Sequence, residues 1–583
     1  MLHTLTRSLR ENKGPALVTV LLSALEVVFE IVIPLFMSNL IDFGIEGGSM
    51  AAVWKFGAFL LLLAAFQLAT GVLAARIAAR ASVGFAANLR EDMYDNVQTF
   101  AFSNIDKFST ASIVTRLTTD TTNVQNAFQM LMRMAIRAPV MLIFSMIVSF
   151  RISRDISMTF LIILPILALA LFFIIRSVFP VFSRVFRTYD ELNNVVQENV
   201  RGIRVVKSFN QERHEIGKFG AISARIYQDF SKGERLITLN APLMQFCIYT
   251  CMIVISWLGA KAIIASGNDP ALGLTTGNLT ALITYTMQIL SSLMMLSMVF
   301  AMLTISLSSA RRIAEVLEER SDIPQPEQPV MTVRDGAVDF DHVSFVYASK
   351  ADKKVLDDID LHIHSGETIG IIGGTGASKS SLVQLIPRLY DVTGGKLTLG
   401  GVDVRDYDLD TLRGAVAMVL QKNELFSGTI AENLRWGNEN ATDEQLRHAC
   451  KLACADEFIS AMPDGYDTHI EQGGTNVSGG QKQRLCIARA LLKKPKVLIL
   501  DDSTSAVDTR TDAQIQQALS TYIPDTTKII IAQRISSVQN ADRIVVLDDG
   551  HIDAVGCHDE LLRTCEIYRE VYESQQKGGE DDA

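Results

Sequence analysis

A glycine-rich stretch that ends in lysine and serine is the clearest chemical motif in the sequence. Residues 373–381 read Gly-Gly-Thr-Gly-Ala-Ser-Lys-Ser-Ser, after an apolar run that predicts a strand and before one that predicts a helix. Backbone N–H groups in such a turn converge on phosphate at a helix N-terminus. Lys379 would reach the β and γ phosphates, and the Ser380 hydroxyl would bind Mg²⁺. The expected nucleotide-binding residues are Gly373, Gly374, Thr375, Gly376, Ala377, Ser378, Lys379, Ser380 and Ser381.

This stretch departs from the usual phosphate-binding pattern at one position. The pattern G-x-x-x-x-G-K-[ST] expects glycine where the chain has Ser378. If that position needs a positive φ, serine would add strain of roughly 1 kcal/mol. On its own, the stretch is equally compatible with a glycine-rich turn that binds no ligand.

Two motifs further along favour the nucleotide. Residues 497–501 read as an apolar strand that ends in Asp501, the carboxylate that a nucleotide-bound Mg²⁺ needs. Between the two motifs lies a Val-Ser-Gly-Gly-Gln sequence, which resembles the signature of the ATP-binding cassette (ABC) family. The resemblance implies an α/β P-loop nucleotide-binding domain whose signature contacts the ATP of a partner. The signature residues are Val477, Ser478, Gly479, Gly480 and Gln481.

The remaining family motifs match one at a time. Tyr347 corresponds to the aromatic residue that stacks on adenine, and Gln421 to the residue that contacts Mg²⁺ and the γ-phosphate. The resemblance therefore implies ATP and Mg²⁺ as cofactors, with Ser380, Gln421 and Asp501 around the metal. The D-loop of the family corresponds to Ser505, Ala506, Val507 and Asp508.

Several positions differ from the family pattern on the hydrolytic side. Asp502 stands where a glutamate usually polarises the attacking water, and Gln533 replaces the switch histidine. Gln472 and Ser378 replace a glutamate before the signature and a P-loop glycine. These differences resemble heterodimeric bacterial multidrug exporters, in which one subunit carries a degenerate ATP site. The resemblance implies a second half-transporter as partner and a location in the bacterial plasma membrane.

Much of the chain before these motifs is apolar. The chain has 583 residues, of which 48% are hydrophobic, and its mean hydropathy is +0.23. Six apolar stretches approach the ~20 residues that a membrane crossing requires. We therefore expect an all-α transmembrane domain of six helices, followed by the α/β domain. The stretches are 15–36, 53–75, 134–150, 156–179, 239–264 and 279–303.

Charge in the connections predicts the orientation. The long polar segments after the second and fourth stretches are rich in Lys and Arg, which places them in the cytoplasm together with both termini. Residues 108–120 and 198–209 in these segments resemble the cytoplasmic loops of ABC exporters. Arg151 and Arg154 do not fit this orientation, because it places them outside the cytoplasm. The two long segments contain more Lys and Arg, so they decide the predicted orientation.

Domain boundaries follow from the change in composition. We expect a transmembrane domain over 1–320, a proline-rich linker over 321–334, a nucleotide-binding domain over 335–575 and a disordered tail over 576–583. The seven cysteines form no set with zinc-site spacing, and basic residues do not gather into a nucleic-acid-binding stripe. The partners we expect are membrane lipid and a small amphiphilic substrate, with no nucleic acid.

Two glutamates in the first apolar stretch bear on the substrate. Glu26 and Glu30 are four residues apart, so they share a helix face within the membrane. They predict either a site for lipophilic cations or pairing with another span. Five methionines on the last stretch, between Met287 and Met302, would add a pliable surface. Export of lipid or peptide, and an ATP-gated channel or regulatory subunit, stay open as alternative functions.

Overall fold

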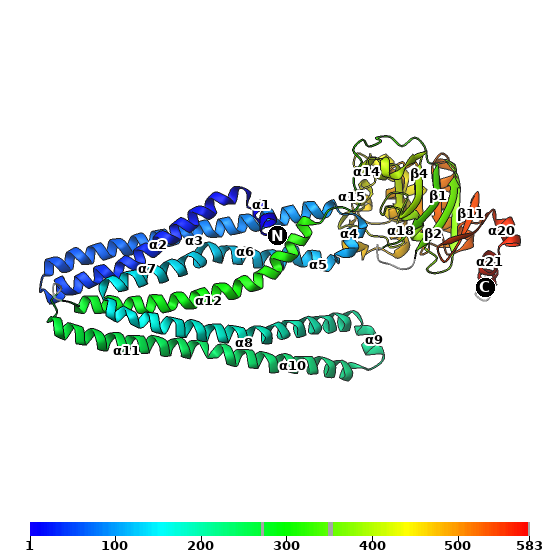
Figure 1. Ribbon diagram of the computed structural model, residues 1–583. Helices are drawn as coiled ribbons and strands as arrows, with labels where there is room; N and C mark the ends of the chain where they lie inside the picture. Colours follow the sequence, from blue (N-terminus) through cyan, green and yellow to red (C-terminus); the bar gives the residue numbers. More distant parts are fainter. Residues whose placement is uncertain (270–272, 348–353, 581–583) are drawn as a thin grey trace. The chain divides into compact units, whose positions relative to one another are not determined.

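The computed structural model describes residues 1–269, 273–347 and 354–580. The chain forms two compact units (Figure 1). The first contains residues Met1–Gln98 and Thr110–Glu319, and the second contains Thr99–Ser109 together with the chain from Arg320 onward.

The first unit is helical. Six helical segments within the described residues are long and apolar enough to cross a membrane, and each contains one of the predicted stretches. This confirms the predicted all-α transmembrane domain. The helices are α1 (Leu2–Arg7), α2 (Lys13–Asn39), α3 (Met50–Gln98), α5 (Thr110–Thr115), α6 (Thr121–Met130), α7 (Ile136–Ile152), α8 (Arg154–Arg201), α9 (Ile203–Ser208), α10 (Glu212–Thr238), α11 (Asn240–Ser266) and α12 (Thr276–Glu318).

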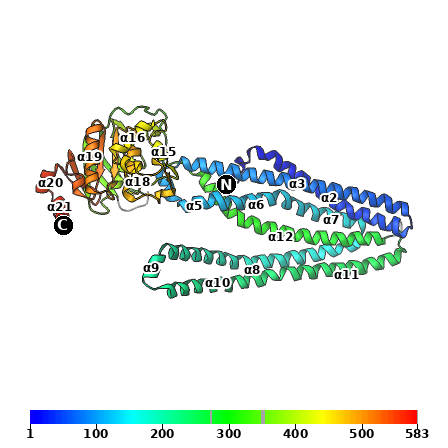
Figure 2. The same ribbon diagram turned by 180° about the vertical axis from the view of Figure 1, so that it is seen from behind.

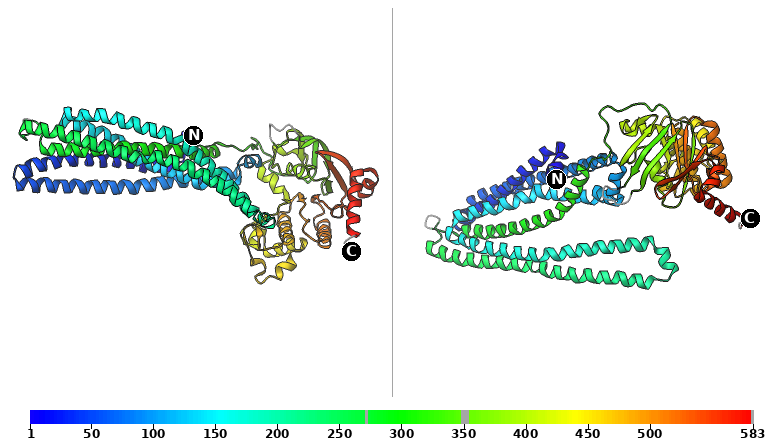
Figure 3. Two further views of the ribbon diagram at one scale, coloured as in Figure 1. Left: turned by 90° about the horizontal axis from the view of Figure 1, so that it is seen from below. Right: turned by 45° about the vertical axis from the view of Figure 1, so that its right-hand side comes forward.

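The helices of this unit pack as two neighbouring groups. Helices α2, α3, α7 and α12 lie together, and α8 lies beside α10 and α11 (Figures 1 and 2). The short helix α9 joins α8 to α10 at the end of a long hairpin, as the two views of Figure 3 also show. Buried apolar residues of α8, α11 and α12, such as Phe160, Ile255 and Ile289, form one core cluster, so α12 of the first group also packs against the second group. Both long polar segments of the sequence are thus helical extensions of apolar helices.

The second unit is an α/β domain. A six-stranded sheet has the order β12-β11-β3-β10-β9-β6, and a four-stranded antiparallel sheet has the order β2-β1-β4-β5. Strands β3, β9 and β10 are central and read as continuous apolar runs, as expected for parallel strands covered on both faces. The strands are β1 (Val338–Phe345), β2 (Leu356–Ile363), β3 (Thr368–Gly373), β4 (Gly394–Leu399), β5 (Val402–Asp403), β6 (Val416–Val419), β7 (Gly428–Thr429), β8 (His469–Ile470), β9 (Val497–Asp501), β10 (Thr527–Ile531), β11 (Arg543–Asp548) and β12 (His551–Gly556).

Helices cover the strands on both faces of the larger sheet and pack against two clusters of buried apolar residues. One group, α15 to α18, carries the signature sequence at the start of α18. The helices are α13 (Lys379–Gln384), α14 (Leu409–Ala415), α15 (Ile430–Arg435), α16 (Asp443–Leu452), α17 (Asp456–Ser460), α18 (Gly479–Leu492), α19 (Thr509–Tyr522), α20 (His558–Thr564) and α21 (Glu566–Glu580).

Two details differ from the boundaries that the sequence predicts. Residues 99–109, which we predicted as part of the transmembrane domain, belong to the second unit and include helix α4 (Phe102–Lys107). The Asn104 side chain explains this, because it donates to the Arg320 carbonyl at 3.0 Å and accepts from the Asp322 N–H at 3.1 Å. Residues 576–580 of the predicted tail continue helix α21, in which Gln576 donates to the Tyr572 hydroxyl at 2.7 Å. Residues 581–583 lie outside the described part.

Candidate nucleotide-binding site

Four adjacent parallel strands bring the predicted nucleotide residues to one edge of the sheet. The order β3, β10, β9, β6 places the P-loop, Gln533, Asp501 and Gln421 at successive carboxyl ends. Ligands of open α/β sheets bind at this edge. The sequence motifs, which are scattered over more than 150 residues, thus belong to one site.

The P-loop has the conformation that its sequence predicts. Ser378 has a φ of +66°, so serine occupies a left-handed position usually filled by glycine, as expected from the pattern. A Cβ added at Gly374 or Gly376 would have no neighbouring atom within 4 Å, so the loop forms an open cradle. The Lys379 ammonium donates to the carbonyl oxygens of Gly373 and Gly374, at 2.8 and 2.9 Å. The loop therefore holds the Lys379 ammonium against its own backbone.

The residues predicted to hold Mg²⁺ meet beside this loop. The Asp501 carboxylate is only 3% exposed. Burial raises the pKa of Asp501, the neighbouring Ser380 hydroxyl acts to lower this pKa, and Asp502 adds to the effect of burial. Burial lowers the pKa of Lys379, against the attraction of Asp501 and Asp502. A hydroxyl and a neighbouring buried carboxylate are oxygen ligands that suit Mg²⁺ on a nucleotide.

Asp502 is held in a hydrogen-bonded arrangement. Its backbone has a φ of +47°, and its N–H donates to the Ile531 carbonyl at 2.9 Å. Its Oδ2 accepts from the Gln533 side-chain amide at 2.8 Å and from the Gln421 amide at 3.4 Å. Asp502 and Gln533, two of the positions at which the sequence departs from the hydrolytic pattern, are therefore direct partners.

Tyr347 belongs to a cluster of three aromatic rings. Its ring centroid lies 4.8 Å from that of Phe345 and 5.1 Å from that of Tyr390, in edge-to-face arrangements. Its hydroxyl forms a hydrogen bond of 2.7 Å with Ser381, next to Ser380, which is predicted to bind Mg²⁺. Tyr347 is 41% exposed, so its ring is accessible for stacking on adenine. Sequence reasoning missed Tyr390, which no family motif had singled out.

The signature forms the N-terminus of α18. The Ser478 hydroxyl accepts from the Gln481 N–H at 3.3 Å, and the Gln481 side chain accepts from the Ser478 N–H at 3.0 Å. This capping box leaves Ser478 and Gly479 exposed. Gln483, which sequence reasoning also missed, donates to Ser505 at 3.3 Å and accepts from the Ala506 N–H at 3.0 Å. The signature helix and the D-loop of one chain are thereby joined.

In the first unit, both predicted substrate carboxylates have a partner. Arg137 at the start of α7 donates to Glu26 at 2.9 Å and to Glu30 at 2.6 Å. The two carboxylates thus pair with another span, and a role for them in substrate binding stays a prediction. The backbone carbonyl of Glu30 also accepts from Gln288 of α12 at 3.3 Å. These contacts of Glu26, Glu30 and Arg137, which we call the charge cluster, join α2, α7 and α12.

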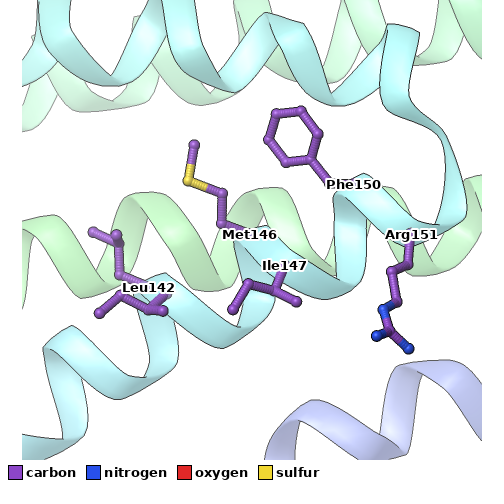
Figure 4. Close-up of a pocket in the computed structure, with 6 residues that line it drawn as sticks. Leu142, Met146, Ile147, Phe150 and Arg151 are labelled. Carbon is purple, nitrogen blue, oxygen red and sulfur yellow. The ribbon is translucent and has the colours of Figure 1, made fainter.

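An apolar hollow of about 520 Å³ lies along α7. Figure 4 shows Met146 and Phe150 pointing to the same side of the helix, with Arg151 directed away from them. On α12, the exposed residues Met287, Met294 and Met298 share one face. The hollow is lined by Leu142, Ile143, Met146, Ile147, Phe150 and Arg151.

Comparison with known proteins agrees with this division of the chain. Residues 16–294 match the family described as "ABC transporter transmembrane region", and residues 356–505 match the family described as "ABC transporter". A solved structure described as a bacterial Atm1-family ABC exporter with ATP bound aligns with a TM-score of 0.82 at 23% identity. The alignment covers 97% of this chain and 99% of the other chain, which shows a shared exporter-type fold.

Sequence relatives extend over nearly the whole chain. The Bacillus subtilis (strain 168) ABC transporter ATP-binding protein YfiB is 35% identical over 558 residues, which are 96% of each chain. The Mycobacterium tuberculosis (strain CDC 1551 / Oshkosh) ABC transporter ATP-binding protein MT1311 is 32% identical over 99% of this chain and 98% of its own length. The chain therefore belongs to the ABC transporter family, as an integral membrane protein whose ATPase activity is coupled to transport.

Proposed function

We propose that this chain is one half of a heterodimeric exporter of amphiphilic compounds and that it contributes the degenerate ATP site. The observation that carries the proposal is the environment of Asp502. Its Oδ2 accepts from the Gln533 amide at 2.8 Å and from the Gln421 amide at 3.4 Å.

This arrangement is poorly suited to activating water. A general base must reach the water, and aspartate is one methylene shorter than the usual glutamate, while two amides already hold its Oδ2. A displacement of about 1 Å can reduce a catalytic rate by ~100-fold. Gln533 can donate to a γ-phosphate, but it cannot carry a proton or a positive charge. Lys379, Asp501 and Tyr347 would hold ATP·Mg²⁺ that turns over slowly.

Exposed surfaces support a partner subunit. Ser478 and Gly479 point outward from the start of α18, where they would complete the ATP site of the other half-transporter. The tip of the α8–α10 hairpin exposes apolar residues around α9, including Val205 at 60% and Phe209 at 71%. Exposed apolar groups of this kind on a predicted cytoplasmic segment indicate a docking surface.

The decisive experiment compares the purified chain alone with the chain co-expressed with a homologous half-transporter. We expect little ATPase activity from the chain alone and restored activity from the pair. In the chain alone, Asp502→Glu combined with Gln533→His should raise ATP turnover by roughly 100-fold, because both hydrolytic groups are restored. Rapid turnover by the chain alone that is unchanged by Asp502→Asn would refute the degenerate site.

The transmembrane unit favours an amphiphilic substrate. The hollow on α7 and the methionine face of α12 offer adaptable apolar surface, and the charge cluster places polar groups within the same helices. We propose that this substrate is exported from the cytoplasm across the bacterial plasma membrane, with the ATPase unit in the cytoplasm. ATP-dependent accumulation of a labelled amphiphile in inverted vesicles would test export. Equilibration without accumulation would instead indicate a channel.

A further inference from the structure

We propose that Gln575 of helix α21 is a positioning residue that fixes the switch residue Gln533 beside Asp502. Its side-chain Nε2 donates to the Gln533 carbonyl at 2.8 Å, and its Oε1 accepts from the Ile535 N–H at 2.9 Å. One amide therefore binds both ends of the turn that follows β10. The nucleotide role of Gln533 in this inference rests on the function proposed above.

The turn connects the C-terminal helix with the ATP site. The Gln533 backbone is bound by Gln575, while its side-chain amide donates to Asp502 at 2.8 Å. Beyond the turn, the Ile535 side chain is 2% exposed and packs in the core. A shift of Gln575 would thus move the backbone that carries the Gln533 side chain.

Helix α21 is anchored to the rest of its domain. Tyr568 is completely buried, and its hydroxyl forms a hydrogen bond of 2.7 Å with His558. Val571 and Tyr572 pack against the core of the domain, one turn before Gln575. The helix therefore presents the Gln575 amide from a fixed position.

The contact requires a side chain that both donates and accepts. Glutamine does both in one planar group, whereas glutamate at neutral pH only accepts and alanine does neither. Glutamate at position 575 would keep the contact with the Ile535 N–H and lose the contact with the Gln533 carbonyl. The two halves of the contact can therefore be separated experimentally.

The test uses the full-length chain in lipid nanodiscs, with Gln575→Ala, Gln575→Glu and the matched control Gln576→Ala. Gln576 is the neighbouring glutamine, and its amide bonds only within α21 to Tyr572 among the contacts described. Hydrogen exchange is followed in the peptide that contains Ile535, and ATP·Mg²⁺ release is followed with a fluorescent ATP analogue. Exchange in strand β10 monitors overall folding.

We expect exchange at Ile535 to become roughly tenfold faster in Gln575→Ala, as for the loss of one hydrogen bond, and to stay unchanged in Gln576→Ala. Gln575→Glu should keep the protection of the Ile535 N–H. Both Gln575→Glu and Gln575→Ala should release ATP faster than the wild type, because both lose the contact with the Gln533 carbonyl. Equal behaviour of Gln575→Ala and Gln576→Ala would overturn the inference. If Gln575→Ala speeds up exchange in strand β10, its overall folding has changed and the test rests on Gln575→Glu. ATP release by Gln575→Glu at the wild-type rate would then overturn the inference. Rapid ATP hydrolysis by the chain alone would refute the proposed degenerate site but not the role of Gln575. The rate of hydrolysis would then be compared among the variants in place of ATP release.

Discussion

The Tyr390 hydroxyl donates a hydrogen bond of 2.8 Å to Asp106 of helix α4. The Tyr390 ring also lies 6.0 Å from Phe102 of the same helix and contacts Tyr347 edge to face. Because Tyr347 bonds to Ser381 beside the P-loop, one side chain connects α4 with the residue predicted to stack on adenine. Helix α4 directly precedes residues 108–120, which resemble the first cytoplasmic loop of ABC exporters.

Tyr390→Phe should therefore weaken the coupling between ATP binding and transport. The substitution keeps the ring cluster and removes only the hydrogen bond to the Asp106 carboxylate. We expect the ATP affinity to change less than twofold and substrate-stimulated ATPase activity of the transporter to fall roughly tenfold, as for the loss of a hydrogen bond to a charged group. Both quantities can be measured on the reconstituted transporter.

Tyr407→Phe serves as the control for this prediction. The Tyr407 hydroxyl donates at the same distance of 2.8 Å, but to the Leu399 carbonyl within the small sheet. Its loss should lower stability without affecting coupling. The same loss of stimulation in both variants would show that Tyr390 acts through stability alone.

The sequence predicts the elements better than the contacts between them. The six spans, the strand before the P-loop and the positive φ of Ser378 follow from apolar runs and glycine patterns, and the structure confirms each. The bond from Arg137 to Glu26 joins residues 111 positions apart, and the bond from Gln575 to Gln533 joins residues on a loop and a distant helix. Such pairs have no periodic signal, because they depend on how the helices and strands pack.

Asp501→Asn should stabilise the nucleotide-free protein and abolish its response to Mg²⁺·ATP. Burial raises the folded pKa of Asp501 above its unfolded value. Between these two pKa values the folded chain binds more protons than the unfolded chain, so the free energy of unfolding falls as pH rises through that range. The loss of stability from the buried, ionised Asp501 persists at pH 7. Thermal unfolding should show a higher Tm for Asp501→Asn at pH 7, with the difference shrinking toward pH ~4. A lower Tm for the variant at pH 7 would contradict this sign.

The charge cluster of Glu26, Glu30 and Arg137 should mainly stabilise the packing of the transmembrane helices. Glu26→Gln with Glu30→Gln removes both partners of Arg137 and should destabilise the transmembrane unit by about 3 kcal/mol, because a cation between helices loses its counter-charges. Adding Arg137→Gln should recover most of that stability. Proteolysis in detergent and transport of cationic and neutral dyes would be measured for both variants.

The variant with all three substitutions separates the two roles of the carboxylates. If the cluster is structural, this variant should transport cationic and neutral dyes equally well. Selective loss of the cationic dye by a stable protein would instead show that Glu26 and Glu30 form a cation site.

Ser478→Ala should impair ATP hydrolysis at the site of the partner subunit. The Ser478 hydroxyl caps α18 and is exposed at the signature, so its loss removes both a cap and the proposed contact with the other nucleotide. Thr442→Ala is a matched control, because Thr442 caps α16 through the same type of box with Gln445. Each substitution should cost about 1 kcal/mol of stability. In the co-expressed pair, only Ser478→Ala should also reduce ATPase activity. We expect a loss of at least tenfold, because the signature hydroxyl would bind the γ-phosphate of the ATP on the partner subunit through a charge-assisted hydrogen bond. Equal ATPase rates in the two variants would show that the hydroxyl serves only to cap its helix, and the pairing of ATP sites between subunits would then need a different contact.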